Sequence, residues 1–155
     1  MNFGDDIFTE ILSWGLQEYA GLSGIVLGAD NHGLYSGRND IHSLASRMSI
    51  PGLTRLNHWR YRNRITHFVL GGGSTLQNVG HLLTDRGGMQ ARCRKLAIGI
   101  SAGPFPDSRA ENEVANYLKN FEFVSFRDDR SYQWGVANGL DHNSHPAFDM
   151  AVLAE

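Results

Sequence analysis

Three short groups of glycine, serine and charged residues could take part in chemistry, because each group directly follows an apolar run of the chain. The triple glycine and serine at positions 71–74 expose backbone N–H groups that can hold an anion, although they match neither a P-loop nor a dinucleotide-binding motif. The guanidinium of Arg127 has the fixed donor fork that grips phosphates and carboxylates. The simpler interpretations are a tight turn for the glycines and a structural ion pair for Arg127.

Ser101 lies at the centre of the pattern Gly-Ile-Ser-Ala-Gly, which matches the nucleophile elbow of serine hydrolases. An elbow requires a helix directly after the serine, but Pro104 and Pro106 delay the next helix. The acid and base of such an enzyme would come from Asp128 or Asp141 and from His142 or His145. We keep a serine hydrolase as an alternative, and favour a turn of small residues beside a ligand.

Other charged clusters favour ordinary surface roles. His142 and His145 have a spacing found in metal sites, but they fall in a polar loop with few further ligands, so we expect no metal. An arginine-rich stretch with interleaved aromatic residues could bind a nucleic acid, an acidic sugar or a lipid-linked diphosphate, or form a solvated helix face. Its members are Arg55, His58, Trp59, Arg60, Tyr61, Arg62 and Arg64.

The composition argues against several classes of protein. The 155 residues are 41% hydrophobic, which suffices for the core of one domain. A net charge of −2 argues against a nucleic-acid partner. Cys93 is the only cysteine, so neither an internal disulfide nor a multi-cysteine zinc site can form. We recognise neither a secretory leader nor an apolar run long enough to cross a membrane, and therefore expect a cytoplasmic protein.

Periodic apolar positions predict helices that alternate with short buried strands. The first helix carries an apolar stripe from Ile7 to Tyr19; Asp5 or Asp6 would cap it and Gly21 would end it. Further helices are expected over residues 40–48, 53–63 and 129–138. One more helix, with the apolar stripe Val114, Ala115 and Leu118, would be capped by Asp107 or Ser108. Strands are expected over residues 24–27, 66–70, 96–100, 121–126 and 147–153.

This alternation predicts an α/β fold with a parallel, doubly wound sheet that has helices on both faces. The carboxyl ends of parallel strands meet at one edge, where ligands bind. We therefore expect residues 71–74, 101–103 and 127–131 to lie along that edge. The chain begins at the turn and helix that would follow a central strand, so we expect that first strand to be missing.

Several segments together resemble the polysaccharide pyruvyl transferase family. They are Asn2-Phe3-Gly4-Asp5-Asp6 before the first helix, Phe68 to Gln77, Ala97 to Phe105, Val124 to Asp128 with Ser131, and Asp149-Met150-Ala151. Each segment is weak evidence alone, but their order and spacing extend along nearly the whole chain.

The resemblance implies an enzyme that moves a pyruvyl group from phosphoenolpyruvate onto sugar hydroxyls, leaving a cyclic ketal and free phosphate, without a cofactor. It also implies two Rossmann-like domains that face each other across a cleft, as in glycosyltransferases of the B type. Residues 1–155 would form a single Rossmann-like domain, the N-terminal half of such an enzyme, with the C-terminal domain absent. Whether this chain is active alone is left open, and a non-catalytic sugar- or nucleotide-binding module or a truncated product is the further alternative.

The expected partners are phosphoenolpyruvate and a glycan acceptor for exopolysaccharide or cell-envelope synthesis. A lipid-linked acceptor would bring the protein to the inner face of the plasma membrane, and self-association would cover its open face. Arg127 would clamp the anionic donor, and Asn2, Asp5 and Ser101 would hydrogen-bond to the acceptor sugar. The general acid is expected in the second domain. The other candidate binding residues are Gly4, Gly71, Gly72, Gly73, Ser74, Gly103, Asp128 and Ser131.

Overall fold

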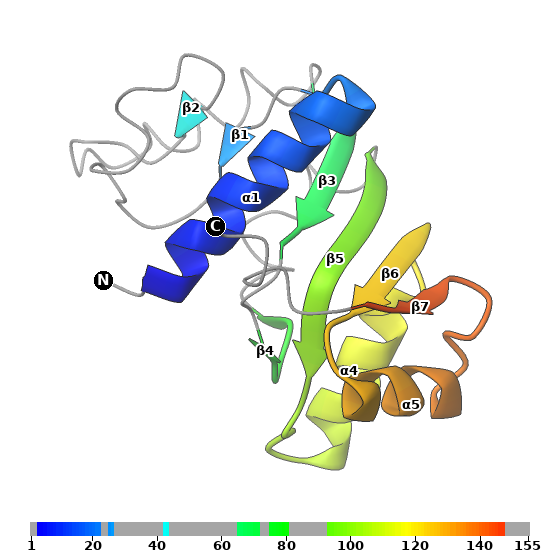
Figure 1. The fold of residues 1–155 in the computed structure, drawn as a ribbon. Helices are drawn as coiled ribbons and strands as arrows, with labels where there is room; N and C mark the ends of the chain where they lie inside the picture. Colours follow the sequence, from blue (N-terminus) through cyan, green and yellow to red (C-terminus); the bar gives the residue numbers. More distant parts are fainter. Residues whose placement is uncertain are drawn as a thin grey trace, which may run out of the picture.

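The computed structural model describes residues 3–22, 25–26, 42–43, 65–71, 75–80 and 93–147. Their main sheet has the strand order β3-β5-β6-β7, and every pairing along this path is parallel (Figure 1). These strands are β3 His67–Leu70, β5 Arg94–Ala102, β6 Phe123–Phe126 and β7 Ser144–Pro146. In addition, β4 Thr75–Leu76 pairs with the end of β5, and β1 Ile25–Val26 pairs with β2 His42–Ser43 in a separate sheet.

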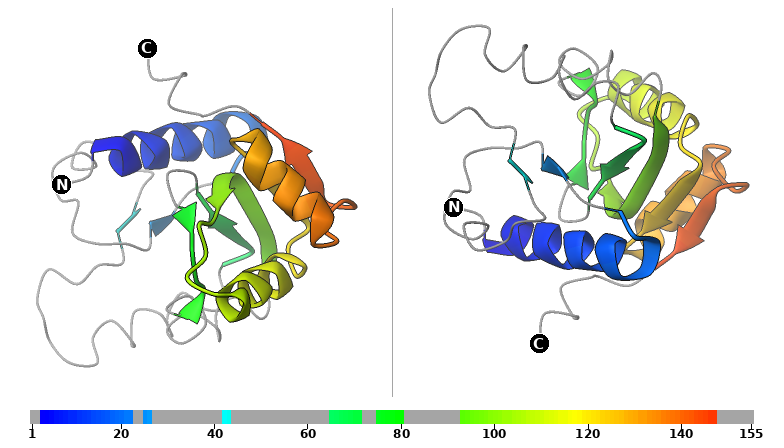
Figure 2. Two further views of the ribbon diagram at one scale, coloured as in Figure 1. Left: turned by 90° about the horizontal axis from the view of Figure 1, so that it is seen from below. Right: turned by 90° about the horizontal axis from the view of Figure 1, so that it is seen from above.

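The helices of the described residues lie on both faces of the main sheet. They are α1 Phe3–Ala20, α4 Ser108–Leu118 and α5 Asp129–Ala137. Figure 2 shows α1 and α4 on opposite sides of the strands. The indole of Trp134 in α5 donates a 2.8 Å hydrogen bond to Glu111 of α4, so these two helices share a face. The predicted α/β, Rossmann-like class is therefore confirmed.

The core lies where β5 and β6 pack against α4 and α5. Two fully buried residues of α4, Val114 and Leu118, come from one helical stripe, and burial of each stabilises the fold by about 1.5–3 kcal/mol. β5 pairs with β3 and β4 on one side and with β6 on the other, so its carboxyl end is fixed from both sides. The buried strand residues that meet the helices include Ala97, Ile100, Val124 and Phe126.

Helix ends follow the residues that the sequence singles out. Asp107 caps α4 by accepting a 2.7 Å hydrogen bond from the Ala110 N–H. Asp128 caps α5 in the same way, through the Ser131 N–H at 2.8 Å. Gly21 follows α1 with φ +63°, a left-handed conformation that glycine adopts at low cost. The predicted cap of α4 and the predicted end of α1 at Gly21 are confirmed.

Two expectations for α1 are wrong. The helix begins at Phe3, so Asp5 and Asp6 lie inside its first turns and do not precede it as caps. Tyr19 belongs to the predicted apolar stripe but is 80% exposed, with its ring edge against Trp14 at a centroid distance of 5.7 Å. Periodicity identified this helix correctly but could not define how much of its stripe would be covered.

The short strands also differ from expectation. Residues 42–43 form the strand β2, although the sequence predicts a helix over residues 40–48. In so short a segment, pairing with β1 determines the backbone conformation. β7 begins three residues before the strand predicted over residues 147–153. Residues 53–63, and most of residues 40–48 and 147–153, lie outside the described part of the chain.

In that described part, no helix is long and apolar enough to span a membrane.

Candidate functional site

Ser101, Arg127 and Asp128 form a hydrogen-bonded cluster where β5 and β6 end. Nε of Arg127 donates to the Ser101 hydroxyl at 2.7 Å, and this hydroxyl donates to Oδ2 of Asp128 at 2.6 Å. The backbone N–H of Arg127 bonds to the Ile100 carbonyl at 3.0 Å and continues the pairing of the two strands. The prediction that these residues share one edge of the sheet is therefore confirmed.

Ser131 connects this cluster to α5. Its hydroxyl donates to Oδ2 of Asp128 at 2.9 Å and accepts a 2.9 Å hydrogen bond from the Ala102 N–H. The residue is 1% exposed. Ser131 therefore joins the start of α5 to the end of β5 and orients the Asp128 carboxylate.

Asp128 is held in its charged form. Burial raises the pKa of Asp128, but hydrogen bonds from Ser101 and Ser131 and the positive charge of Arg127 outweigh this effect and bring the pKa below its ordinary value of 3.8. A carboxylate with a lowered pKa is a weak base at neutral pH. The cluster is suited to accept hydrogen bonds and to hold Arg127 in place, and less suited to remove a proton.

Gly71 and Thr75, the described residues on either side of positions 72–74, lie on the β3 and β4 side of β5. Gly71 directly follows β3, and Thr75 of β4 pairs with Ser101. A Cβ at Gly71 would come within 2.9 Å of Leu12, so glycine permits the close approach of α1. Gly71 and Arg127 thus lie at the same edge of the sheet, as predicted. Gly72, Gly73 and Ser74 lie outside the described residues.

Of the remaining predicted residues, Gly103 lies at the same edge, and the others belong to α1 or lie outside the described chain. Gly103 directly follows β5 with φ +75°, and its N–H donates to the Leu76 carbonyl at 3.0 Å. Gly4 and Asp5 are the second and third residues of α1, whose N-terminal end points toward the edge where β3 ends (Figure 1). Asn2 lies outside the described residues. Contact of any of these residues with a substrate stays a prediction.

The histidines considered for catalysis and metal binding lie elsewhere. Within the described residues, the Ser101 hydroxyl bonds to Arg127 and Asp128 and to no histidine. His145 belongs to β7 instead of a loop, and its ring stacks on Phe123 with centroids 4.9 Å apart. In the described part of the chain, no group of three or more His, Cys, Asp or Glu side chains could hold a metal ion.

Comparison with known families decides the classification. A model of the polysaccharide pyruvyl transferase family matches residues 2–155. The chain belongs to this family. The predicted resemblance is therefore confirmed over almost the whole chain. Neither the curated proteins nor the solved structures contain a match to it.

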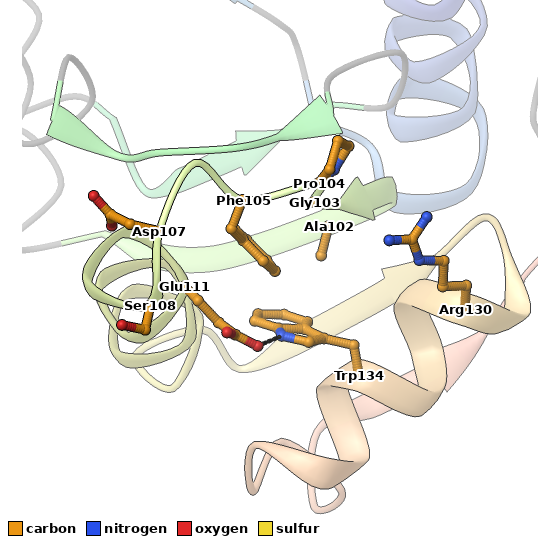
Figure 3. Close-up of a pocket in the computed structure, with 9 residues that line it drawn as sticks. All are labelled: Ala102, Gly103, Pro104, Phe105, Asp107, Ser108, Glu111, Arg130 and Trp134. Atoms are coloured by element: carbon orange, nitrogen blue, oxygen red, sulfur yellow. Dashed lines mark hydrogen bonds between the residues drawn. The ribbon is translucent and has the colours of Figure 1, made fainter.

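This pyruvyl transferase family member has a cavity beside the Ser101 cluster that the sequence did not indicate. The cavity has a volume of about 460 Å³ and lies between the starts of α4 and α5 (Figure 3). Its lining includes Phe105, Arg130 and Trp134. One signal was available, since Phe105 directly follows the turn after β5 and Arg130 and Trp134 are four residues apart on one helix. Only the packing of α4 against α5 brings these side chains together.

Proposed function

We propose that this chain takes part in the transfer of a pyruvyl group from phosphoenolpyruvate to hydroxyls of a polysaccharide or of its lipid-linked precursor. Membership of the family supports pyruvyl transfer in general. The observation that carries the proposal is the position of Arg127, which lies at the carboxyl edge of the sheet, bonded to Ser101 and beside Asp128. Ligands of open α/β sheets bind along this edge.

The reaction converts the enol of phosphoenolpyruvate into a ketal. A proton adds to the methylene carbon and leaves a cationic centre on the neighbouring carbon. Two sugar hydroxyl oxygens form bonds to this centre, its bond to the phosphate oxygen breaks, and phosphate leaves. The two protons lost by the hydroxyls balance the proton gained by carbon and the proton gained by phosphate.

The cluster meets part of what this reaction demands. The donor carries a carboxylate and a phosphate, and a guanidinium binds such groups through paired N–H donors. The hydrogen bond from Nε of Arg127 to Ser101 places such a guanidinium at this edge of the sheet. Oxygen atoms of Ser101 and Asp128 would accept hydrogen bonds from sugar hydroxyls. We expect backbone N–H groups after Gly71 to add dipoles, and a second domain to supply the general acid.

The family name implies a polysaccharide acceptor. We propose that the acceptor is an exopolysaccharide or cell-envelope polymer. If it is lipid-linked, the reaction takes place at the cytoplasmic face of the plasma membrane. The chemistry requires neither a metal nor an organic cofactor, because phosphoenolpyruvate already carries the activated pyruvyl group.

Binding of phosphoenolpyruvate to Arg127 variants tests this function. We expect Arg127→Ala to weaken binding about tenfold or more, which is about 1.4 kcal/mol, in isothermal titration calorimetry. Arg127→Lys keeps the charge without the donor fork and should give an intermediate affinity. Circular dichroism checks that both variants are folded.

Arg109→Ala is the matched control. Arg109 is an exposed arginine of α4 that pairs with Glu113 at 2.9 Å. Its variant should bind phosphoenolpyruvate as tightly as the wild type. The proposal is wrong if the wild type does not bind phosphoenolpyruvate, or if Arg127→Ala and Arg109→Ala bind it equally well.

A further inference from the structure

The cavity between α4 and α5 has an aromatic wall. The rings of Phe105 and Trp134 have centroids 5.0 Å apart and are tilted by 39°. The indole N–H of Trp134 donates to Oε1 of Glu111 at 2.8 Å, and the same indole meets the ring of Phe126 edge-on at 6.4 Å. These contacts from three directions fix the indole before any ligand arrives, which lowers the entropic cost of binding.

Charged groups of both signs surround this wall. Asp107 and Glu111 line the cavity from the α4 side, and Arg130 lines it from the α5 side (Figure 3). Asp107 has one carboxylate oxygen engaged as the cap of α4. The polar lining therefore offers hydrogen-bond acceptors on one side and donors on the other.

This combination selects against two classes of ligand. An anion such as a nucleotide would gain from Arg130 but would face the carboxylates of Asp107 and Glu111. An apolar molecule would remove water from three charged side chains without replacing their hydrogen bonds. A neutral molecule that presents hydroxyl groups at its edges and C–H groups on its faces satisfies both the charges and the rings. At about 460 Å³, the cavity is within the usual size range of small-molecule sites, about 300–1,000 Å³.

The cavity adjoins the Ser101 cluster through the chain itself. Ala102 lines the cavity and directly follows Ser101 on β5. Arg130 follows Arg127 by three residues, across the start of α5. A ligand that extends over the end of β5 could therefore occupy the cavity and reach the cluster at the same time.

We propose that this cavity is a binding subsite for a neutral sugar unit of the acceptor glycan, adjacent to the unit that receives the pyruvyl group. The position of this subsite next to the reacting sugar unit rests on the proposed function. The binding of a neutral sugar is argued separately, from Trp134, Arg130 and the carboxylates of Asp107 and Glu111. The sugar ring packs against the aromatic wall, its hydroxyls donate to Asp107 and Glu111, and the Arg130 guanidinium donates to its oxygens.

Fluorine NMR of the full chain labelled with 5-fluorotryptophan tests the subsite. The chain contains three tryptophans, and Trp134→Phe identifies the resonance of Trp134. The probes are neutral di- and trisaccharides of glucose, galactose, mannose and N-acetylglucosamine, with glucuronic acid as the anionic comparison. We expect at least one neutral oligosaccharide to shift the Trp134 resonance in a saturable manner, and glucuronic acid to bind more weakly.

Two arginine variants complete the test. Arg130→Ala removes an exposed side chain and should weaken oligosaccharide binding about tenfold, which is about 1.4 kcal/mol, whereas Arg109→Ala on the outer surface of α4 should bind as the wild type does. A Trp134 resonance that no neutral probe shifts overturns the subsite, as does tighter binding of glucuronic acid or equal affinity of the two variants.

A separate titration with phosphoenolpyruvate distinguishes the two proposals. If phosphoenolpyruvate binds in an Arg127-dependent manner while no neutral sugar binds, the subsite is wrong and the proposed function stands. If a neutral sugar binds in an Arg130-dependent manner while phosphoenolpyruvate does not, the sugar site stands and its assignment to a pyruvyl transfer reaction is wrong.

Discussion

At the scale of single residues, Ser131 and Ser144 are two buried serines with opposite surroundings. The Ser131 hydroxyl bonds to Asp128 and to the Ala102 N–H. Ser144 is 6% exposed, and its hydroxyl finds no partner among the residues that the structure describes. On folding, the Ser131 hydroxyl exchanges its hydrogen bonds to water for hydrogen bonds within the protein. The Ser144 hydroxyl loses its hydrogen bonds to water without such replacement, which costs free energy.

Ser131→Ala should therefore destabilise the protein by about 1–3 kcal/mol, because it leaves the buried Ala102 N–H without its acceptor. Urea unfolding monitored by circular dichroism measures this loss. Ser144→Ala is the matched control and should leave the free energy of unfolding unchanged or slightly raised. Equal destabilisation by the two substitutions would contradict the assigned role of the Ser131 hydroxyl.

The lowered pKa of Asp128 predicts a pH dependence of stability. A carboxyl group whose pKa is lower in the folded state than in the unfolded state stabilises the fold above the ordinary value of 3.8. This contribution is lost as the pH falls through the lowered pKa. Asp128→Asn keeps a good helix cap but removes the charge. We expect the wild type to exceed this variant in unfolding free energy at neutral pH, with a difference that shrinks below pH 3.8. A pH-independent difference would be evidence against a charged Asp128 in the cluster.

The residues of the cluster could be predicted in part from the sequence. Ser101, Arg127 and Asp128 each follow an apolar run, and parallel strands end at a common edge, so their proximity followed from the fold class. The link from Ser131 to Ala102 could not be predicted, because it depends on where α5 starts relative to the end of β5. The same holds for Trp134 and Glu111, which meet only because α4 and α5 share a face.

At the scale of elements, α5 packs against β6 at Gly135. A Cβ at this position would lie 2.6 Å from the ring of Phe126, which is fully buried and has little room to move. Gly15 of α1 is also helical, but a Cβ there would meet nothing within 4 Å. Alanine substitutions at the two positions therefore distinguish the effect of a steric clash on stability from the effect of a less flexible backbone.

Gly135→Ala should destabilise the protein by about 1–3 kcal/mol, because the added methyl pushes α5 away from β6. Gly15→Ala should instead stabilise it by about 0.5–1 kcal/mol, since alanine favours the helical backbone and meets no obstacle. Thermal and urea unfolding measure both effects. The same sign for the two substitutions would contradict the packing of α5 described above.

Elements with a clear hydrophobic pattern were predicted well, and very short ones were not. The helix α4 has 11 residues and the strand β5 has nine, so each is long enough for a pattern to be recognised. β4 has two residues and β7 has three, which is too few for a period to be recognised. Their conformation is decided by pairing with β5 and β6, and pairing is a property of the fold instead of the local sequence.

At the scale of the whole molecule, β5 holds the described sheet together. Its carboxyl end forms the Ser101 cluster, and its amino end follows Cys93, whose thiol donates to the Ile65 carbonyl at 3.4 Å. Burial raises the pKa of the Cys93 thiol, and the nearby charge of Lys95 offsets only part of this effect. At neutral pH the thiol is therefore mostly protonated and reacts slowly with thiol reagents.

Cys93 is the only cysteine of the chain, so its reactivity reports on how the molecule opens. We expect labelling by a disulfide reagent at neutral pH to be slower in the folded protein than in urea by about tenfold or more, and to accelerate as the pH rises. Gly135 contacts Phe126 at the opposite end of the strands from Cys93. If exposure of the thiol requires cooperative opening of the whole sheet, Gly135→Ala should accelerate labelling by the factor that corresponds to its loss of unfolding free energy. An unchanged labelling rate in this destabilised variant would mean that the amino end of β5 opens locally, so that its two ends are not one cooperative unit.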